Sequence, residues 1–262
     1  MNWIEALLLG ILQGLTEFLP VSSSGHLELG KILMGIESKE SLMFTVVVHG
    51  ATVLSTIVVF WKDIVKLFKG FFAFKWNFEM QYIVKIVISM IPVLIVGLFF
   101  KDFVEQFFSG NLLFVGSMLL VTAFILALTY YYKPKEKDIT FLDSLIIGIA
   151  QAIAVLPGIS RSGSTIATGL LLGNKKENIA RFSFLMVLAP IIGANILDLS
   201  DTATTFNGVG ILPLTVGFFA AFLSGLAACK WMINIVKKGK LIYFAVYCAI
   251  VGSTALGFYV FG

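Results

Sequence analysis

Charged residues are scarce in this sequence. Asp, Glu, Lys and Arg make up 13% of the 262 residues, whereas 58% of the residues are hydrophobic. A soluble globular domain usually carries about 25% charged residues, because its surface has to be hydrated. The low charge and the mean hydropathy of +0.97 exclude a water-soluble globule and predict a protein that crosses a membrane several times.

Cysteine is rare as well. The two cysteines, Cys229 and Cys248, lie within apolar runs, and their spacing matches no metal site. We therefore expect both to be small, buried hydrophobic side chains. The N-terminal stretch has no basic leader and no small-residue cleavage site, so we do not expect a removable signal peptide.

Long apolar runs are abundant. Six of them approach the roughly 20 residues that a helix needs to cross a hydrocarbon core of about 30 Å. They span 42–61, 82–100, 110–132, 179–198, 209–229 and 241–261. Two further stretches, 3–35 and 140–173, are broken by proline and a Ser/Gly cluster, and second arms of about 11 residues reach only halfway across. These stretches predict re-entrant hairpins, whose irregular backbone must face protein or a water-filled cavity.

The two broken stretches resemble each other. At an offset of 138 residues, identical residues meet in the pairs Gly10 and Gly148, Ile11 and Ile149, Gln13 and Gln151, Ser22 and Ser160, Ser24 and Ser162, Gly25 and Gly163, Gly35 and Gly173, and Phe44 and Phe182. This indicates an internal repeat, 1–132 and 140–262, in which each copy has one hairpin and three crossings. Because three is odd, the second copy enters the membrane upside down. The sequence thus predicts an all-α fold of six transmembrane helices and two re-entrant hairpins in an inverted-topology repeat.

The basic residues follow one side of this topology. If the first hairpin opens outside, the inside segments contain fourteen Lys and Arg residues, and the outside segments contain only Lys31, Lys39 and Lys101. This is the positive-inside pattern, so the pI near 9.0 reflects topology, and we expect no nucleic-acid partner. The run 62–75 alternates lysine with phenylalanine, which predicts a helix lying on the inner leaflet.

The most polar stretch is QGLTEFLPVSSSGH, at 13–26. Gln13 and Glu17 are four residues apart and share one face of the first arm before Pro20 ends it. The second arm begins with residues that suit a helix N-terminus, whose free N–H groups attract anions. These residues are Ser22, Ser23, Ser24 and Gly25.

The second hairpin carries PGISRSGST, at 157–165, and adds an arginine to a second helix N-terminus. Two helix N-termini, a guanidinium fork and up to seven hydroxyls form an anion site that suits phosphate. The hydroxyls belong to Ser22, Ser23, Ser24, Ser160, Ser162, Ser164 and Thr165. The predicted ligands of a phosphate-bearing head group are Ser22, Ser24, Gly25, Ser160, Arg161, Ser162, Gly163 and Thr165.

The two copies differ in their ionisable residues. At the repeat offset, Glu17 faces a valine, Ser23 faces Arg161 and His26 faces a serine. An acid, an imidazole and an arginine around a phosphate cradle form a hydrolytic set. Glu17 can hold a divalent cation or a water, and His26 can transfer a proton near neutral pH. Arg161 can neutralise developing charge, and Ser23 is a candidate nucleophile.

Other roles stay open at this stage. Arg161 can pair with Glu17 and hold the two repeats together, and it can do so in the empty state while binding phosphate in the loaded one. His26 can be structural. His49 lies in a predicted crossing without a motif, so we expect a structural hydrogen bond there. Residue types alone permit either a serine nucleophile or a metal-activated water.

The stretches 13–26 and 157–165 closely resemble the two signatures of the bacterial undecaprenyl-diphosphate phosphatases of the bacitracin-resistance type. That family combines an (E/Q)xxxE stretch, serines and a histidine with PGxSRSxxT, and the resemblance covers essentially the whole chain. It implies hydrolysis of a C55 polyprenyl diphosphate to the monophosphate and phosphate, which recycles the lipid carrier of peptidoglycan synthesis. It also implies a divalent cation, Mg²⁺ or Ca²⁺, with Glu17 and Gln13 as the expected metal ligands.

The resemblance further implies a multi-pass protein of the bacterial inner membrane, with the active site open to the periplasmic side. Its partners are then the lipid substrate and membrane lipid, and a homo-oligomer is left open. The alternative is a lipid-phosphate flippase or secondary transporter, because inverted repeats with broken helices also build transporters. The acid and the imidazole favour the enzyme.

Overall fold

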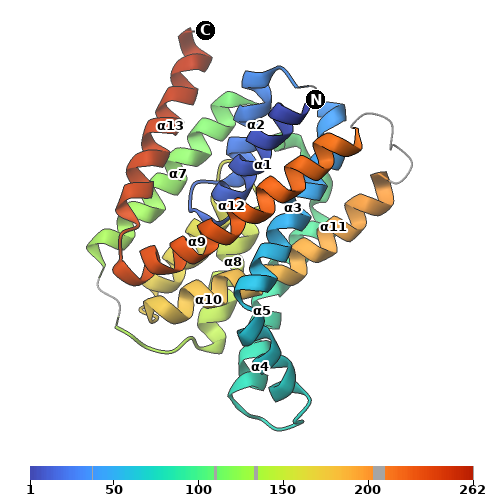
Figure 1. Cartoon of the computed structure of the whole chain (residues 1–262). Coiled ribbons are helices and arrows are strands. Elements are labelled where there is room, and N and C mark those ends of the chain that lie inside the picture. The colour runs from blue at the N-terminus through green and yellow to red at the C-terminus, as the bar shows by residue number, and fades with distance from the viewer. Residues whose placement is uncertain (37, 109–110, 133–134, 203–209, 262) are drawn as a thin grey trace.

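The computed structural model describes residues 1–36, 38–108, 111–132, 135–202 and 210–261 (Figure 1). The described residues form thirteen α-helices and one short 3₁₀ helix, with no strand beyond a single bridge between Lys137 and Asn174. The predicted all-α class is confirmed. In chain order, the elements are α1 (Trp3–Phe18), α2 (Ser23–Met34), α3 (Ser38–Val59), α4 (Trp61–Phe71), α5 (Phe78–Phe99), α6 (Lys101–Glu105), η1 (Gln106–Phe108), α7 (Leu112–Tyr131), α8 (Phe141–Ile153), α9 (Arg161–Leu171), α10 (Lys176–Met186), α11 (Leu188–Thr202), α12 (Ile211–Lys238) and α13 (Ile242–Phe261).

Among the described residues, five helical segments are long and apolar enough to cross a membrane, and α3 with α4 makes a sixth if this bent pair is one span. Four of them are the single helices α5, α7, α12 and α13. The fifth is formed by α10 together with α11. The helix α4 departs from the direction of α3 by 74° and buries none of its residues, as suits the predicted amphipathic helix. Its place on the inner leaflet stays a prediction.

One predicted crossing ends too early. The apolar run stops at 229, but α12 continues to Lys238 and has 28 residues. The added turns carry lysines, among them Lys237 and Lys238 in the last turn. Lysines at a helix end interact favourably with the helix dipole and can leave the hydrocarbon, so the helix outlasts the apolar run.

Both predicted hairpins are pairs of short helices. After α1, Leu19 takes the extended conformation that a following proline favours, and Ser22 then caps α2. In the second hairpin, Ser160 caps α9. The first helices start 138 residues apart, and so do the second helices, which is the offset at which the sequence repeats. The division at 132 and 140 and the inverted orientation in a membrane stay predictions.

Small residues let the helices approach closely. The helix α1 lies along α12, and α7 lies along α13 (Figure 1). A Cβ atom on Gly14 of α1 would lie 2.5 Å from the carbonyl oxygen of Ala221 in α12. Gly116 of α7 and Gly252 of α13 are related in the same way, since a Cβ on either would lie about 3 Å from the carbonyl oxygen of the other. Such backbone contact is a main source of helix association where lipid surrounds the protein.

Both cysteines are buried and free, as predicted. The Cys248 thiol of α13 donates to the carbonyl oxygen of Pro20 over 3.6 Å. The helix α13 therefore packs on the break in the first hairpin.

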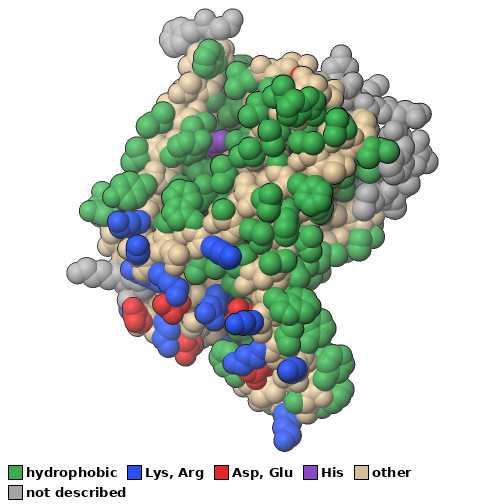
Figure 2. All heavy atoms as spheres, in the orientation of Figure 1, with side chains coloured by type: hydrophobic (Ala, Val, Ile, Leu, Met, Phe, Trp, Pro, Cys, Tyr) green, Lys and Arg blue, Asp and Glu red, His purple; other side chains and the backbone are tan. Residues whose placement is uncertain are grey.

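Lys and Arg side chains gather at one end of the molecule, where α4 and α10 lie (Figure 2). Hydrophobic side chains cover much of the remaining surface in this view. A surface of this kind is suited to a hydrocarbon environment with one basic end at the membrane interface.

The contact of Gly14 with α12 predicts a large difference between two equivalent substitutions. We expect Gly14→Ala to lower the free energy of unfolding by about 1–3 kcal/mol, because the new methyl group meets backbone atoms that cannot move aside. The matched control is Gly97→Ala in α5, where a Cβ meets nothing within 4 Å among the described residues and helix propensity rises. Thermal unfolding in detergent measures both; equal melting temperatures would contradict the close packing of α1 on α12.

Candidate active site

The helix α1 holds the acid of the site. Gln13 and Glu17 lie one turn apart and are 0% and 7% exposed. Gln13 Nε2 donates to Glu17 Oε2 over 2.9 Å, so the shared face predicted from their spacing is confirmed. The amide holds the carboxylate in one direction.

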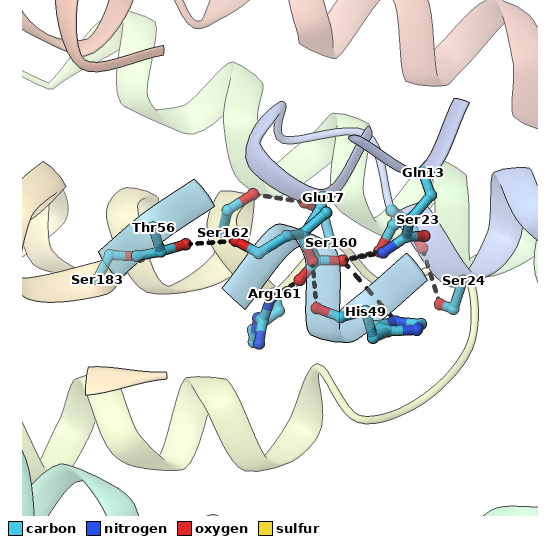
Figure 3. Close-up of polar contacts among 12 residues, drawn as sticks. Gln13, Glu17, Ser23, Ser24, His49, Thr56, Ser160, Arg161, Ser162 and Ser183 are labelled. Atoms are coloured by element: carbon cyan, nitrogen blue, oxygen red, sulfur yellow. Dashed lines mark hydrogen bonds and ion pairs between the residues drawn. The ribbon is translucent and has the colours of Figure 1, made fainter. Parts of the chain in front are cut away.

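Glu17 joins the two hairpins (Figure 3). The guanidinium of Arg161, the first residue of α9, forms an ion pair with Glu17 Oε1. Ser23 Oγ donates to Glu17 Oε2 over 2.7 Å, and His49 Nε2 of α3 lies 3.9 Å from the same oxygen. Burial of an unpaired carboxylate costs several kcal/mol, so these partners are what allows an acid at this depth.

A strained turn presents the serines of the first hairpin. Ser22 has φ +70°, a left-handed conformation that is uncommon for a residue with a side chain. Its Oγ caps α2 by accepting from the N–H of Gly25 over 3.3 Å and lies 3.3 Å from Ser24 Oγ. Three consecutive serines thus stand at the N-terminus of α2.

The helix α7 supports the corresponding loop of the second hairpin. Gly158 has φ +95°, and a Cβ there would lie 2.6 Å from a carbonyl oxygen of α7. Thr122 Oγ1 of α7 donates to the carbonyl of Gly158 over 3.1 Å and accepts from the N–H of Ser160 over 3.0 Å. Ser160 Oγ accepts from the N–H of Gly163 and caps α9. The loop is thereby fixed immediately before Arg161.

A cavity of about 360 Å³ lies beside this cluster. Its polar wall consists of Glu17, Ser22, Ser23, Ser24, Thr45, His49, Gln151, Arg161 and Asn195. A guanidinium and hydroxyls can bind a phosphate group, while the carboxylate can accept a proton or hold a cation. Five of the twelve predicted site residues line this cavity, namely Glu17, Ser22, Ser23, Ser24 and Arg161.

The remaining predicted ligands lie outside the wall of this cavity. They are Gly25, Ser160, Ser162, Gly163 and Thr165. Ser162 Oγ donates to the carbonyl of Leu19 over 3.3 Å, and Thr165 Oγ1 lies 2.6 Å from Ser183 Oγ of α10. These hydroxyls bind α9 to its neighbours, and their contacts with a phosphate group stay predictions.

His26 also lies outside the wall of the cavity. Its Nδ1 is 2.9 Å from the carbonyl oxygen of Ser22, and its Nε2 is 2.9 Å from the hydroxyl of Tyr247 in α13. Because a carbonyl only accepts, Nδ1 carries the proton and Nε2 accepts from the tyrosine. The imidazole ties the strained serine turn to α13, and its role in proton transfer stays a prediction.

Sequence reasoning expected a structural role for His49. Its Nδ1 does lie 2.8 Å from the carbonyl oxygen of Thr45, one turn earlier. Its Nε2, however, faces Glu17, and the side chain lines the cavity. The position of His49 within a predicted membrane crossing could have indicated this role, because ionisable residues at membrane depth are usually functional. Gln151 and Asn195 were also missed, although Gln151 matches Gln13 in the repeat.

The predicted metal ligands fit a hard cation. In the described part of the chain, no three His, Cys, Asp and Glu side chains group around one point, so amide and hydroxyl oxygens would have to contribute. Gln13 Oε1 is buried without a hydrogen-bond partner among the described residues, on the same side chain that bonds Glu17. An unpaired carbonyl oxygen beside a carboxylate is a donor set that Mg²⁺ and Ca²⁺ favour.

Fold and site together define a class: a multi-pass helical membrane protein with a carboxylate, a guanidinium and hydroxyls around one cavity, which suits a phosphate-bearing ligand. Residues 6–254 match the family described as bacitracin resistance protein BacA. The chain belongs to this family.

Several relatives are similar along their whole length. The chain is 62% identical over 260 residues to the undecaprenyl-diphosphatase of Parabacteroides distasonis and 60% identical over 260 residues to that of Bacteroides thetaiotaomicron, and each comparison covers 98% of both chains. The undecaprenyl-diphosphatase of Carboxydothermus hydrogenoformans is 41% identical over 263 residues, which cover 98% of this chain and 97% of the relative.

The buried ion pair predicts a coupled effect on stability. Arg161→Ala leaves the Glu17 carboxylate without its cation, and we expect the free energy of unfolding to fall by about 3–5 kcal/mol. Adding Glu17→Gln should recover part of this loss, because a neutral amide needs no counter-charge. Thermal unfolding of the wild type, both single variants and the double variant measures the coupling.

The control cycle uses the exposed pair Lys175 and Asp138, whose atoms are 3.0 Å apart. We expect a coupling of at most about 1 kcal/mol there, because water screens the charges. Strictly additive losses for Glu17 and Arg161 would contradict the ion pair.

Proposed function

We propose that the protein is an integral-membrane phosphatase that hydrolyses undecaprenyl diphosphate to undecaprenyl phosphate and inorganic phosphate. The observation that carries the proposal is the cluster of Glu17, Arg161 and Ser23 in one cavity. It is supported by the identity of 60–62% to proteins named undecaprenyl-diphosphatase. A carrier of a phosphate head group also needs the arginine, but it has little use for an acid bonded to a serine.

Substrate binding begins at Arg161. Its side chain is 24% exposed, whereas that of Glu17 is 5% exposed. The diphosphate carries more negative charge than one carboxylate and takes over the donors of the guanidinium in a bidentate contact. The hydroxyls of Ser22 and Ser24 donate to further phosphate oxygens. Arg161 thereby releases Glu17 from the ion pair, and the carboxylate becomes free to accept a proton.

The chemical step uses Ser23 as nucleophile. Its Oγ attacks the terminal phosphorus while the hydroxyl proton passes to Glu17 Oε2, 2.7 Å away. The bond from this phosphorus to the bridging oxygen breaks, and the oxygen keeps the electron pair. The proton then passes to the departing monophosphate. The restored carboxylate takes a proton from a water that attacks the phosphoserine, the P–Oγ bond breaks, and the proton returns to Ser23 Oγ as inorganic phosphate leaves. Arg161 offsets the charge that develops on the transferred group.

The cofactor in this proposal is Mg²⁺ or Ca²⁺. Gln13 Oε1, which is unpaired among the described residues, and the Glu17 carboxylate would hold it. The bound cation supplies positive charge against the diphosphate.

The proposed location is the bacterial inner membrane. The basic end of the molecule (Figure 2) faces the cytoplasm by the positive-inside rule, and the cavity opens to the periplasmic side. Its apolar wall, which includes Val46, Val93, Val187 and Ile191, suits the first isoprene units, and the rest of the tail leaves between helices into lipid. The product returns the lipid carrier to peptidoglycan synthesis.

The direct test is phosphate release from undecaprenyl diphosphate by the purified protein in detergent. We expect release with Mg²⁺ or Ca²⁺, loss of release with a chelator, and a fall of at least about 10²-fold in Arg161→Ala, which lacks the guanidinium that binds and stabilises the transferred group. A protein that binds the lipid but releases no phosphate would favour the flippase or transporter instead.

A second test separates the serine nucleophile from direct attack by water. We expect Ser23→Ala to lower the rate of phosphate release by at least about 10³-fold, because the covalent path is lost. The control is Ser117→Ala in α7, whose hydroxyl donates to the carbonyl of Leu113 and should leave the rate unchanged. Rapid quenching with substrate labelled in the terminal phosphate should trap phosphoserine at Ser23. Full activity in Ser23→Ala, without a labelled protein, would assign the attack to water.

A further inference from the structure

Gln151 is a buried polar residue that the reaction described above does not use. It lies on α8, the first helix of the second hairpin, two residues before the last helical residue, Ile153. It is 1% exposed. It lines the same cavity as Glu17, Ser23 and Arg161. Gln151 belongs to the second hairpin. Arg161 is the other polar residue of this hairpin that lines the cavity.

Neither polar atom of this side chain has a hydrogen-bond partner in the described part of the chain. Gln151 Nε2 and Oε1 are both buried, and neither forms a hydrogen bond within the described residues. Burial of an unpaired amide is unfavourable by several kcal/mol, and nearly all buried polar groups are hydrogen-bonded. A leucine would fill the same space at lower cost, so an amide at this position points to a ligand that pairs with it.

The repeat explains why the amide is free. In the first hairpin, Gln13 uses its Nε2 to bond Glu17, four residues later. The residue four positions after Gln151 is Val155, which has no acceptor, and it lines the cavity as well. The second hairpin therefore keeps the glutamine but lacks the carboxylate that the amide of Gln13 bonds, so the amide of Gln151 is left unpaired among the described residues.

We propose that Gln151 binds the diphosphate group of the substrate, with Nε2–H donating to a non-bridging phosphate oxygen. The inference rests on the proposed function and adds a specificity-determining residue to it. The cavity already offers Arg161 and three serine hydroxyls to an anion, and an amide N–H is a further donor for phosphate oxygen. Gln151 then holds the head group from the second hairpin, while Ser23 belongs to the first.

The test compares two substitutions at Gln151 with a control on the same helix. Gln151→Leu keeps the side-chain volume but removes the donors. We expect KM for undecaprenyl diphosphate to rise roughly 10- to 100-fold and kcat to change less than about threefold. The reason is that a hydrogen bond to a charged group stabilises the bound substrate and the transition state alike. Gln151→Glu places a negative charge against the diphosphate and should raise KM further. The control is Ser144→Ala, a buried α8 residue bonded to the carbonyl of Phe141, which should leave KM unchanged.

The melting temperature of the protein without ligand distinguishes substrate binding by Gln151 from a purely structural role. Because Gln151→Leu removes unpaired buried atoms, its melting temperature should equal or exceed that of the wild type. A Gln151→Leu variant with the KM of the wild type would overturn the proposal, as would a fall in melting temperature that accounts for the loss of activity.

Binding without turnover distinguishes this inference from the proposed function. The probes are undecaprenyl phosphate and inorganic pyrophosphate, each titrated while the melting temperature is followed in wild type and variants. We expect both to raise the melting temperature of the wild type and Ser144→Ala, and the concentration needed to rise at least tenfold in Gln151→Leu. If the wild type binds these probes but releases no phosphate from undecaprenyl diphosphate, the proposed reaction fails while Gln151 as a phosphate ligand stands. Equal binding by wild type and Gln151→Leu, or no binding by either, overturns the role of Gln151.

Discussion

The ion pair between Glu17 and Arg161 is the interaction on which the rest of the structure depends. It joins residues 144 positions apart, one from each broken helical hairpin. In a membrane, each of these charges alone would cost several kcal/mol, and together they are tolerated only when they meet. The tips of both hairpins must therefore share one place. The breaks between Phe18 and Ser23 and between Ile153 and Arg161 serve this contact, because the second helix of each hairpin begins beside it.

The surrounding elements hold this contact with groups that are not charged. Thr122 of α7 bonds the backbone on both sides of the second break, and Cys248 and Tyr247 of α13 hold the first break from its other side. Close packing of α7 on α13 fixes the two supports relative to each other. The site is thus built on irregular loops, yet each loop is fastened to a long helix, which keeps the hydroxyls and the guanidinium in place.

Much of the fold follows from local patterns. Apolar runs predict the long helices, and the Pro, Ser and Gly clusters predict the breaks, because each depends on neighbouring residues alone. The site follows only in part. The spacing of Gln13 and Glu17 fixes their common face, but His26 turns to Tyr247, 221 residues away, and His49 approaches Glu17 from α3. Those contacts depend on how helices rotate about their axes when they pack, and no local pattern in a single sequence encodes that rotation.

The two partners of the ion pair differ in exposure, and this difference decides which of them an entering anion displaces. Glu17 is held by Gln13 and Ser23 in addition to Arg161, whereas the guanidinium lines the cavity and is the more exposed of the two. An entering anion therefore displaces the carboxylate from Arg161 and not the reverse. Ser23 stays bonded to the same carboxylate, so the acceptor of its proton is freed from Arg161 when the phosphate arrives. In the proposed reaction, the empty site keeps its nucleophile inactive, and the substrate itself activates it.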